Sequence, residues 1–415
     1  MKKTKIIAAL MLFALSLGLT GCASVQADDL TEGISRGQVD GKAADSDFIG
    51  ANMSFSLKLF KNVQKEKPQD NVLVSPLSVT AALAMTANGA DGETLSQTEE
   101  LLGGNISLEQ LNGYLYGCLD SFKSGEGFKL NIANSVWIKN DPNLTVEKEF
   151  LQKTVDYYDA QVYSEDFDSK TLNAVNNWVK ANTGGMIPKI IDKIDQDTVM
   201  YLINALAFDA EWEKIYKDYQ VKNGTFTDIN GKEQGVKMMG SDEYGYLEDE
   251  NAAGFLKNYK GGKYSFAALL PNENITVNEY IQGLTAEGLL KTLSKPQSCT
   301  VNTKMPKFSY DFGLSLKDTL ISMGMTSAFD GTADFSKMAH YAGENIYVND
   351  VIHKTFISVD EKGTKAGAAT AVEINTESAA PADEQKTVIL DRPFVYMIIN
   401  NETNLPIFMG TVKSV

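Results

Sequence analysis

The feature that most constrains this chain is a stretch of small residues shortly before its last strands. Residues 361–386, EKGTKAGAATAVEINTESAAPADEQK, contain no Leu, Phe, Tyr, Trp or Met. From Thr364 to Ile374 every second residue is small or apolar, and the charges fall on the positions between them. This period of two is typical of a strand with one buried face. Because Gly363 and Gly367 weaken a strand, the segment can become a strand without being compelled to form one.

Outside this segment, helical patterns concentrate early in the chain and strand patterns late. Residues 47–64 carry apolar side chains at helical spacing, and Ser75 with Pro76 begins a helix that ends near Gly89. TVMYLINALAF, NIYVNDVIHKTFISVD, FVYMIINN and IFMGTV read as strands. Residues 47–415 show no second linker and no repeat. We therefore expect an α+β fold, one large domain built around more than one sheet.

The first residues indicate export. MKKTK is a positive segment, an apolar run follows it, and LTGC at residues 19–22 resembles the lipobox of bacterial lipoproteins. We expect residues 1–21 to be a signal peptide, Cys22 to be lipidated, and residues 22–46 to be a flexible polar tether. The protein would then be lipid-anchored at a bacterial cell surface or secreted. The alternative is an ordinary secretory signal with an incidental cysteine.

Composition and missing motifs exclude several classes of function. The chain has 415 residues and a net charge of −16, which argues against a nucleic-acid partner. It lacks G-x-S-x-G, H-E-x-x-H and Walker motifs. We therefore expect no catalytic residue, metal ligand or cofactor. We expect Cys118 and Cys299 to be two buried thiols, and one disulfide between them is the alternative. A hydrolase would have to use His340 or His353, the only histidines.

Four polar residues interrupt apolar segments. Asn204 lies inside TVMYLINALAF, His353 lies inside a late strand, and Ser75 and Ser78 flank Pro76 at a helix start. A buried amide or imidazole needs hydrogen-bond partners. Each residue could be satisfied separately, as a helix cap or a core polar group. The alternative is that all four meet in one network, where a sheet could open without exposing only apolar surface.

Motifs along residues 47–415 resemble those of the serpins, the serine protease inhibitor family. One departure is Met186, where the family usually has lysine. The motifs, in chain order, are NVLVSPLSVTAALAM (71–85), VNNWVKANTGGMI (175–187), VKMM (236–239), PKF (306–308), GMTSAFD (324–330), EKGTKAGAATA (361–371), RPFVYMI (392–398) and NLPIFMGTV (404–412).

The resemblance implies three β-sheets, eight or nine helices and an exposed reactive-centre loop. It places the four polar residues at the shutter beneath the main sheet, and Trp212 at the breach, where strand insertion begins. It implies that a serine protease cleaves the loop and is trapped as an acyl-enzyme while the loop inserts into the main sheet. The hinge residues would be Glu361, Gly363, Thr364, Ala366 and Ala368.

The resemblance also places the cleaved bond at Glu377–Ser378, a fixed distance after the hinge glutamate. Because the stretch that follows is longer than usual in the family, the cut could fall later, among Ser378, Ala379 and Ala380. The small neighbouring residues favour an elastase-like or subtilisin-like protease, with a glutamate-specific protease second. We expect a monomer that forms a covalent complex with its target serine protease. It would contact the membrane only through its lipid anchor. A non-inhibitory serpin, acting as a cell-surface binding module, is the alternative.

Overall fold

The computed structural model describes residues 27–121, 125, 127–194, 198–342, 345–364 and 385–415. These residues contain nine α-helices and three sheets, which confirms the α+β prediction. The helices are α1 (Ser46–Glu66), α2 (Pro76–Ala87), α3 (Gly92–Gly103), α4 (Leu108–Ser121), α5 (Lys148–Tyr158), α6 (Ser169–Asn182), α7 (Val277–Gly283), α8 (Ala286–Ser294) and α9 (Lys317–Ser322). A 3₁₀ helix, η1, spans Asp218–Gln220.

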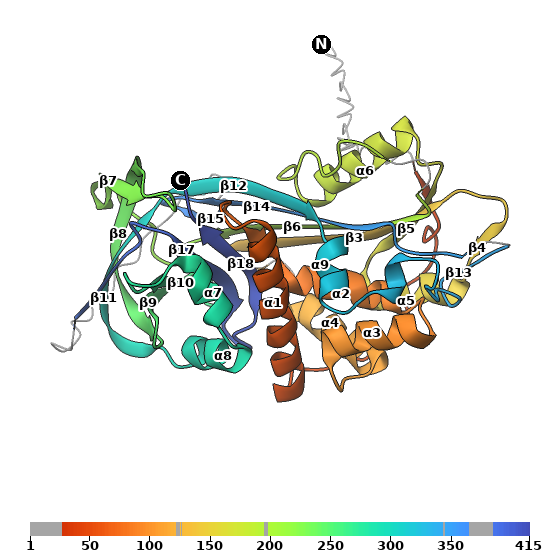
Figure 1. Ribbon diagram of the computed structural model, residues 1–415, viewed down its shortest axis with the longest axis horizontal. Coiled ribbons are helices and arrows are strands. Elements are labelled where there is room, and N and C mark those ends of the chain that lie inside the picture. Colours follow the sequence, from red (N-terminus) through yellow and green to blue (C-terminus); the bar gives the residue numbers. More distant parts are fainter. Residues whose placement is uncertain (1–26, 122–124, 126, 195–197, 343–344, 365–384) are drawn as a thin grey trace, which may run out of the picture.

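The main sheet has seven strands, and its long axis follows that of the molecule (Figure 1). In sheet order its strands are β1 (Asp28–Asp29), β5 (Gln161–Glu165), β3 (Phe128–Lys139), β6 (Met200–Glu211), β15 (Gly363–Thr364), β14 (Asp350–Val359) and β12 (Phe308–Ser315).

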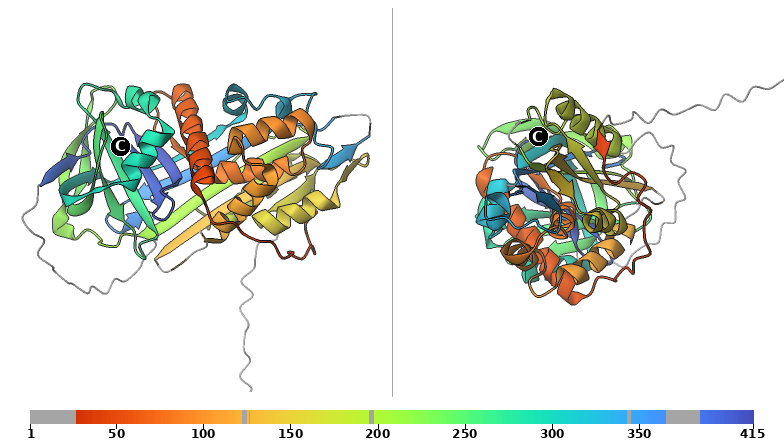
Figure 2. Two further views of the ribbon diagram at one scale, coloured as in Figure 1. Left: turned by 90° about the horizontal axis from the view of Figure 1, so that it is seen from below. Right: turned by 90° about the vertical axis from the view of Figure 1, so that its right-hand side faces the viewer.

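The second sheet has nine strands and occupies one end of the molecule, whereas α2 to α5 occupy the other end (Figure 2). Its strands in order are β16 (Lys386–Ile389), β11 (Gln297–Pro306), β8 (Glu233–Glu248), β9 (Ala252–Asn258), β10 (Tyr264–Pro271), β17 (Phe394–Asn400), β18 (Pro406–Val412) and β2 (Leu73–Val74), and β7 (Val221–Thr227) pairs with β8. The third sheet is β4 (Leu144–Val146) with β13 (Ala339–Tyr341).

Helices cover both faces of the main sheet. On one face, every residue of α2 is buried, because this helix lies between the sheet and the outer helices (Figure 1). On the other face, α6 packs against the sheet through a separate small core that includes Trp137, Tyr163 and Trp178. The main sheet is therefore buried on both faces along much of its length, and a polar residue in its strands needs a partner from within the protein.

The segment expected to be a flexible tether differs from that expectation over its described part, residues 27–45. β1 adds to the edge of β5, and the Leu30 N–H donates to the Val162 carbonyl at 2.8 Å. The Lys42 N–H donates to the Gly113 carbonyl at 2.9 Å, and Asp45 caps α1 by accepting from the Phe48 N–H. The segment packs because the edge of β5 offers unpaired backbone groups. Among the described residues, no helix is long and apolar enough to cross a membrane.

Candidate functional site

The centre of the main sheet contains a seam between two parallel strands. β6 and β14 pair directly, with Tyr201 opposite Asp350 at one end of the ladder and Ala207 opposite Phe356 at the other. Beyond that point β15 lies between them, and Thr364 pairs with Ala210 of β6 and Val359 of β14. Because β15 is antiparallel to both neighbours, it is the start of a strand that separates a parallel pair.

The turn into β15 requires glycine. A Cβ atom on Gly363 would lie 2.0 Å from the Ala210 carbonyl oxygen, closer than any side chain tolerates. The Asp360 carboxylate accepts from the N–H groups of Lys362 and Gly363 at 2.8 and 3.3 Å, which closes the turn. Glu361 forms an ion pair with Lys307, and this pairing lowers the pKa of the Glu361 carboxyl. The turn into β15 is therefore fixed by the Asp360 hydrogen bonds and by the ion pair between Glu361 and Lys307.

Trp212, the residue after β6, contacts this turn through two hydrogen bonds. Its backbone N–H donates to the Lys362 carbonyl, and its indole N–H donates to the Asp360 carbonyl, both at 2.9 Å. Its ring stacks on Tyr259 with centroids 4.4 Å apart. The Tyr259 hydroxyl lies 2.5 Å from the hydroxyl of Thr364, which is 1% exposed. Trp212 thus binds the turn before β15, and Tyr259 contacts the Thr364 side chain within β15.

A buried ion pair that sequence reasoning missed supports this anchor. The Lys257 ammonium lies 2.7 Å from the Glu243 carboxylate, and both residues are buried. The same ammonium lies 4.4 Å from the centre of the Tyr216 ring and 5.5 Å from that of Trp212. Lys257 therefore helps to position the two aromatic residues that contact the hinge, since the Tyr216 N–H donates to the Glu361 carbonyl. Neither charge stands out from its strand in the sequence.

Beneath the seam the four polar residues meet in one network. The Ser75 N–H donates to His353 Nε2 at 3.1 Å, and His353 Nδ1 lies 2.5 Å from Asn204 Oδ1. The Asn204 amide donates to the Ser78 carbonyl at 2.9 Å and to its hydroxyl at 2.5 Å. Because a backbone N–H can only donate, Nε2 must accept and Nδ1 must carry the proton. His353 is therefore neutral, and its complete burial lowers its pKa to about 3.

Asn134 belongs to the same network and was not singled out from the sequence. It lies on β3 directly opposite Asn204, whose amide donates to the Asn134 side-chain oxygen at 2.5 Å. Asn204 in turn lies opposite His353 on β14. Three polar side chains thus form a row across three neighbouring strands. The available signal was an asparagine inside the strand-like run NIANSVWI.

Ser75 is placed differently from a capping serine. It occupies the N-cap position of α2, but its side chain makes no capping hydrogen bond. Its buried hydroxyl has no hydrogen-bond partner among the described residues. Its contribution to the network is the backbone N–H that binds His353.

Several predicted residues lie outside the described part of the chain. They are the hinge residues Ala366 and Ala368, the bond Glu377–Ser378, and Cys22. Within the described part, no group of three His, Cys, Asp or Glu residues is placed to hold a metal ion. Cys118 and Cys299 are free thiols there, and burial raises the pKa of the Cys118 thiol to about 12.

The fold feature at this site is a short strand, β15, that separates two otherwise parallel strands at one end of the main sheet. The chain matches the model of the family described as serpin (serine protease inhibitor) over residues 50–415. It therefore belongs to the serpin family. Members of this family are typically protease inhibitors rather than enzymes, although some are non-inhibitory.

Three relatives, one of them in two conformational states, illustrate the range of similarity. The thermophilic serpin tengpin in its native state is 49% identical, with a TM-score of 0.89 and coverage of 94% of this chain and 100% of that chain. Tengpin in its latent state gives 48% identity, a TM-score of 0.79 and coverage of 90% and 100%. A serpin-like protein of Thermococcus kodakarensis is 31% identical, covering 88% of this chain and 85% of its own. The leukocyte elastase inhibitor of Bos taurus is 29% identical, with 88% and 98% covered.

Proposed function

We propose that this protein is a suicide-substrate inhibitor of extracellular serine proteases, with elastase-like or subtilisin-like enzymes as its targets. The observation that carries the proposal is β15, in which Gly363 and Thr364 already pair with β6 on one side and Thr364 pairs with β14 on the other. The loop residues that follow would extend the same strand along the seam, with their small side chains directed inward.

In this proposal, insertion of the loop as a new strand supplies the free energy that traps the protease. One parallel ladder between β6 and β14 is replaced by two antiparallel ladders, which are slightly more stable per residue. Each added hydrogen bond contributes roughly 1 kcal/mol, and burial of Val372 and Ile374 contributes about 2 kcal/mol each. The total is comparable to the stability of a whole domain. It is therefore large enough to distort the active site of a protease that the strand carries with it.

The chemistry begins as ordinary proteolysis. The catalytic serine of the protease attacks the carbonyl carbon of Glu377, an ester bond forms, and the peptide bond to Ser378 breaks. The new amino group of Ser378 leaves with the proton from the protease histidine. The chain after the cut stays attached through β16, which pairs with β11 over four residues. Only the side that carries the protease is then free to insert.

The residues around the proposed bond support the choice of target. Residues 366–385 contain no Lys or Arg, so a trypsin-like pocket would leave its buried carboxylate unpaired. They also contain no aromatic residue and no Leu, which disfavours a chymotrypsin-like pocket. Short side chains suit elastase-like and subtilisin-like pockets, and Glu377 itself makes a glutamate-specific protease the second candidate. The bovine relative named for leukocyte elastase agrees with the first choice.

Two further sequence features bear on where the protein is located and on the alternative of a non-inhibitory serpin. LTGC supports lipid attachment at Cys22, which would hold the inhibitor at the outer surface of the membrane. A non-inhibitory serpin would be expected to block insertion with a bulky, charged or proline residue at an inward position. From Thr364 to Ile374 the inward residues are Thr, Ala and small aliphatic side chains, which disfavours that alternative.

The test is complex formation. The purified protein is incubated with pancreatic elastase, subtilisin, a glutamate-specific protease and trypsin, and each mixture is run on a denaturing gel. We expect a covalent complex with elastase or subtilisin, and mass spectrometry of that complex should find a released peptide that begins at Ser378. Cleavage of the loop by every protease without any covalent complex would show that the protein is not an inhibitor. Complexes with trypsin alone would show that the assigned specificity is wrong.

A further inference from the structure

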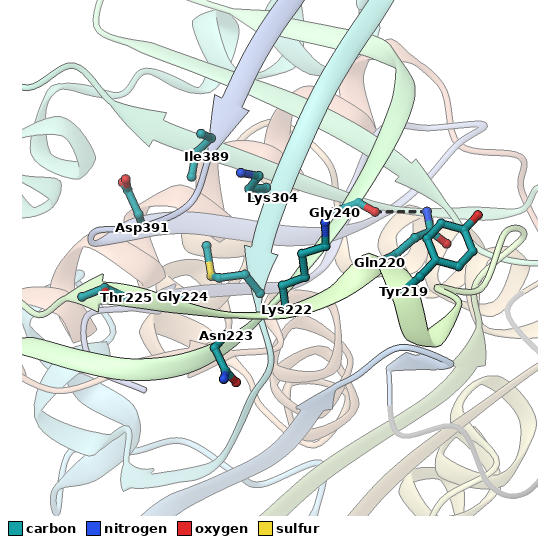
Figure 3. Close-up of a pocket in the computed structure, with 11 residues that line it drawn as sticks. Tyr219, Gln220, Lys222, Asn223, Gly224, Thr225, Gly240, Lys304, Ile389 and Asp391 are labelled. Atoms are coloured by element: carbon teal, nitrogen blue, oxygen red, sulfur yellow. Dashed lines mark hydrogen bonds between the residues drawn. The ribbon is translucent and has the colours of Figure 1, made fainter.

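A groove of about 460 Å³ crosses four neighbouring strands at the loop-bearing end of the molecule (Figure 3). The strands are β7, β8, β11 and β16, and their register places Lys222 beside Met238 and Lys304 beside both Gly240 and Ile389. Residues of η1 form one end of the groove, and Asp391 forms the other. Nothing in the shutter, the hinge or the breach uses this surface.

The floor of the groove is apolar and its rim is cationic. Met238 and Ile389 provide apolar floor, and Met238 lies over Gly224, where an added Cβ would come within 2.5 Å of its side chain. Lys222 and Lys304 are exposed and form no ion pair with a described residue, whereas Asp391 pairs with Arg392 at 3.4 Å. A chain of net charge −16 therefore presents, beside an apolar floor, two exposed cations that form no ion pair within the described part of the chain.

An exposed aromatic residue stands at the rim. Tyr219 on η1 is 71% exposed, and the only other exposed aromatic side chain among the described residues is Tyr244, at 53%. Exposed tyrosine beside an apolar floor is typical of a protein-contact surface, because its ring buries a large area at little entropic cost.

The strand that follows the reactive loop lines the groove, and the start of the loop is hydrogen-bonded close to the residues at its rim. Ile389 lies on β16, the strand into which the loop returns. Tyr219 lies three residues after Tyr216, whose N–H binds the Glu361 carbonyl at the loop's start. The chain from Ser378 to Gln385 spans at most roughly 25 Å. A protease domain of ordinary size is roughly 45 Å across. A protease bound at Ser378 must therefore cover part of this end of the molecule.

We propose that the groove is a second contact surface for the target protease, which places there an apolar side chain flanked by carboxylates. The inference rests on the proposed function, because the protease bound to the loop is the occupant that the loop's length brings to this surface. Contacts of this kind accelerate encounter and set the choice among proteases with similar active-site pockets. They take no part in strand insertion.

The test uses charge reversal with a matched control. The double variant Lys222→Glu/Lys304→Glu removes the cationic rim, and Tyr219→Ala removes the aromatic contact. The control, Lys291→Glu/Lys295→Glu, makes the same change in net charge on exposed residues at α8, outside the groove. Each protein is mixed with the protease that the wild type inhibits fastest, and the rate constant and the stoichiometry of complex formation are measured separately.

We expect the groove double variant to form complexes about tenfold more slowly at low salt, with less difference at high salt. Tyr219→Ala should be slower by a similar or smaller factor, and the control should match the wild type. Stoichiometry should be unchanged throughout, because insertion does not involve these residues.

Equal rates for the groove variants and the wild type, or equal slowing in the control, would overturn the proposal. Absence of any wild-type complex would reject the proposed function itself.

Discussion

At the scale of single residues, the hydrogen bond between Asn204 and His353 joins the two strands of the seam in addition to their backbone ladder. The two side chains lie on directly neighbouring strands, and neighbouring strands lie about 4.8 Å apart. A strand inserted between them roughly doubles that separation, so their 2.5 Å contact cannot survive insertion. Under the proposed insertion mechanism, the network would therefore stabilise the form with the loop outside the sheet, and its hydrogen bonds would have to change when the sheet opens.

The neutral state of His353 predicts a loss of stability in acid. In the unfolded chain the imidazole titrates at its ordinary pKa of 6.5, whereas burial lowers the folded pKa to about 3. Between these values only the unfolded chain takes up the proton, so the free energy of unfolding falls by about 1.4 kcal/mol per pH unit below 6.5. The measurement is denaturant unfolding at pH 7 and pH 5 for the wild type and His353→Gln.

The variant is the control in that comparison, because it keeps a polar side chain but has no proton to gain. Its stability should depend less on pH than that of the wild type, by about 2 kcal/mol between pH 7 and pH 5. Identical pH dependence in the two proteins would mean that His353 makes no contribution.

Substitution of Thr364 tests whether loop insertion is required for inhibition. Thr364→Arg places a charge where the threonine is 1% exposed and its hydroxyl contacts Tyr259, so insertion would cost several kcal/mol more. We expect the variant to be cleaved as a substrate without trapping the protease, as judged on a denaturing gel. Lys362→Ala is a suitable control, because Lys362 is exposed in the same turn. Wild-type stoichiometry in Thr364→Arg would contradict the insertion mechanism.

At the scale of elements, the main sheet is covered at one edge, and its central seam is closed except at the end that holds β15. β1 covers the edge of β5, and the backbone contacts of residues 30–42 continue that cover over α4 and α5. At the centre, β15 holds the two strands apart over its two residues only. The proposed insertion would therefore separate β6 from β14 inside a sheet whose edge strand, β5, is itself paired with β1.

Removal of that cover predicts lower stability and self-association. Deletion of residues 23–44 keeps the Asp45 cap of α1 but removes β1 and several backbone hydrogen bonds, each worth roughly 1 kcal/mol. We expect a thermal midpoint lower by several degrees, and dimers or larger species on a sizing column, because the edge of β5 becomes free to pair. Glu32→Ala/Gln38→Ala, at exposed positions of the same segment, should behave as the wild type. An unchanged midpoint after deletion would show that the packed segment does not stabilise the fold.

At the scale of the whole molecule, the loop-bearing end brings together the hinge, the breach and the groove. The TM-score to tengpin is higher for its native state, at 0.89, than for its latent state, at 0.79. The fold described here is therefore more similar to the native form, with most of the seam closed between β6 and β14.

The attachment of the molecule to a membrane is predicted from the lipobox-like residues alone. Cys22→Ala removes the only acceptor for lipid in LTGC, so the variant should lose label from a lipid precursor and leave the membrane fraction. Ser24→Ala, just beyond the cysteine, is the control and should remain anchored. Retention of Cys22→Ala in the membrane fraction would exclude Cys22 as the anchor.

The sequence by itself determined the fold class and the residue types at the seam. Hydrophobic periodicity was enough for an α+β fold with more than one sheet, because those patterns depend on local spacing, and the resemblance to the serpins implied that there are three sheets. Asn204 and His353 could be singled out because a polar side chain inside an apolar strand needs a partner. The alternation after Thr364 could be read because a strand with one buried face repeats every two residues.

Only the tertiary structure decided which residues meet. Asn134 joins Asn204 through the register of β3 and β6, and Lys257 finds Glu243 across β8 and β9. The polar composition of residues 27–45 suggested a free tether, but that segment packs because β5 leaves an unpaired edge. In each case the partner is fixed by strand pairing between distant parts of the chain. Periodicity shows which face a residue occupies, but it carries no information about the register that brings two residues together.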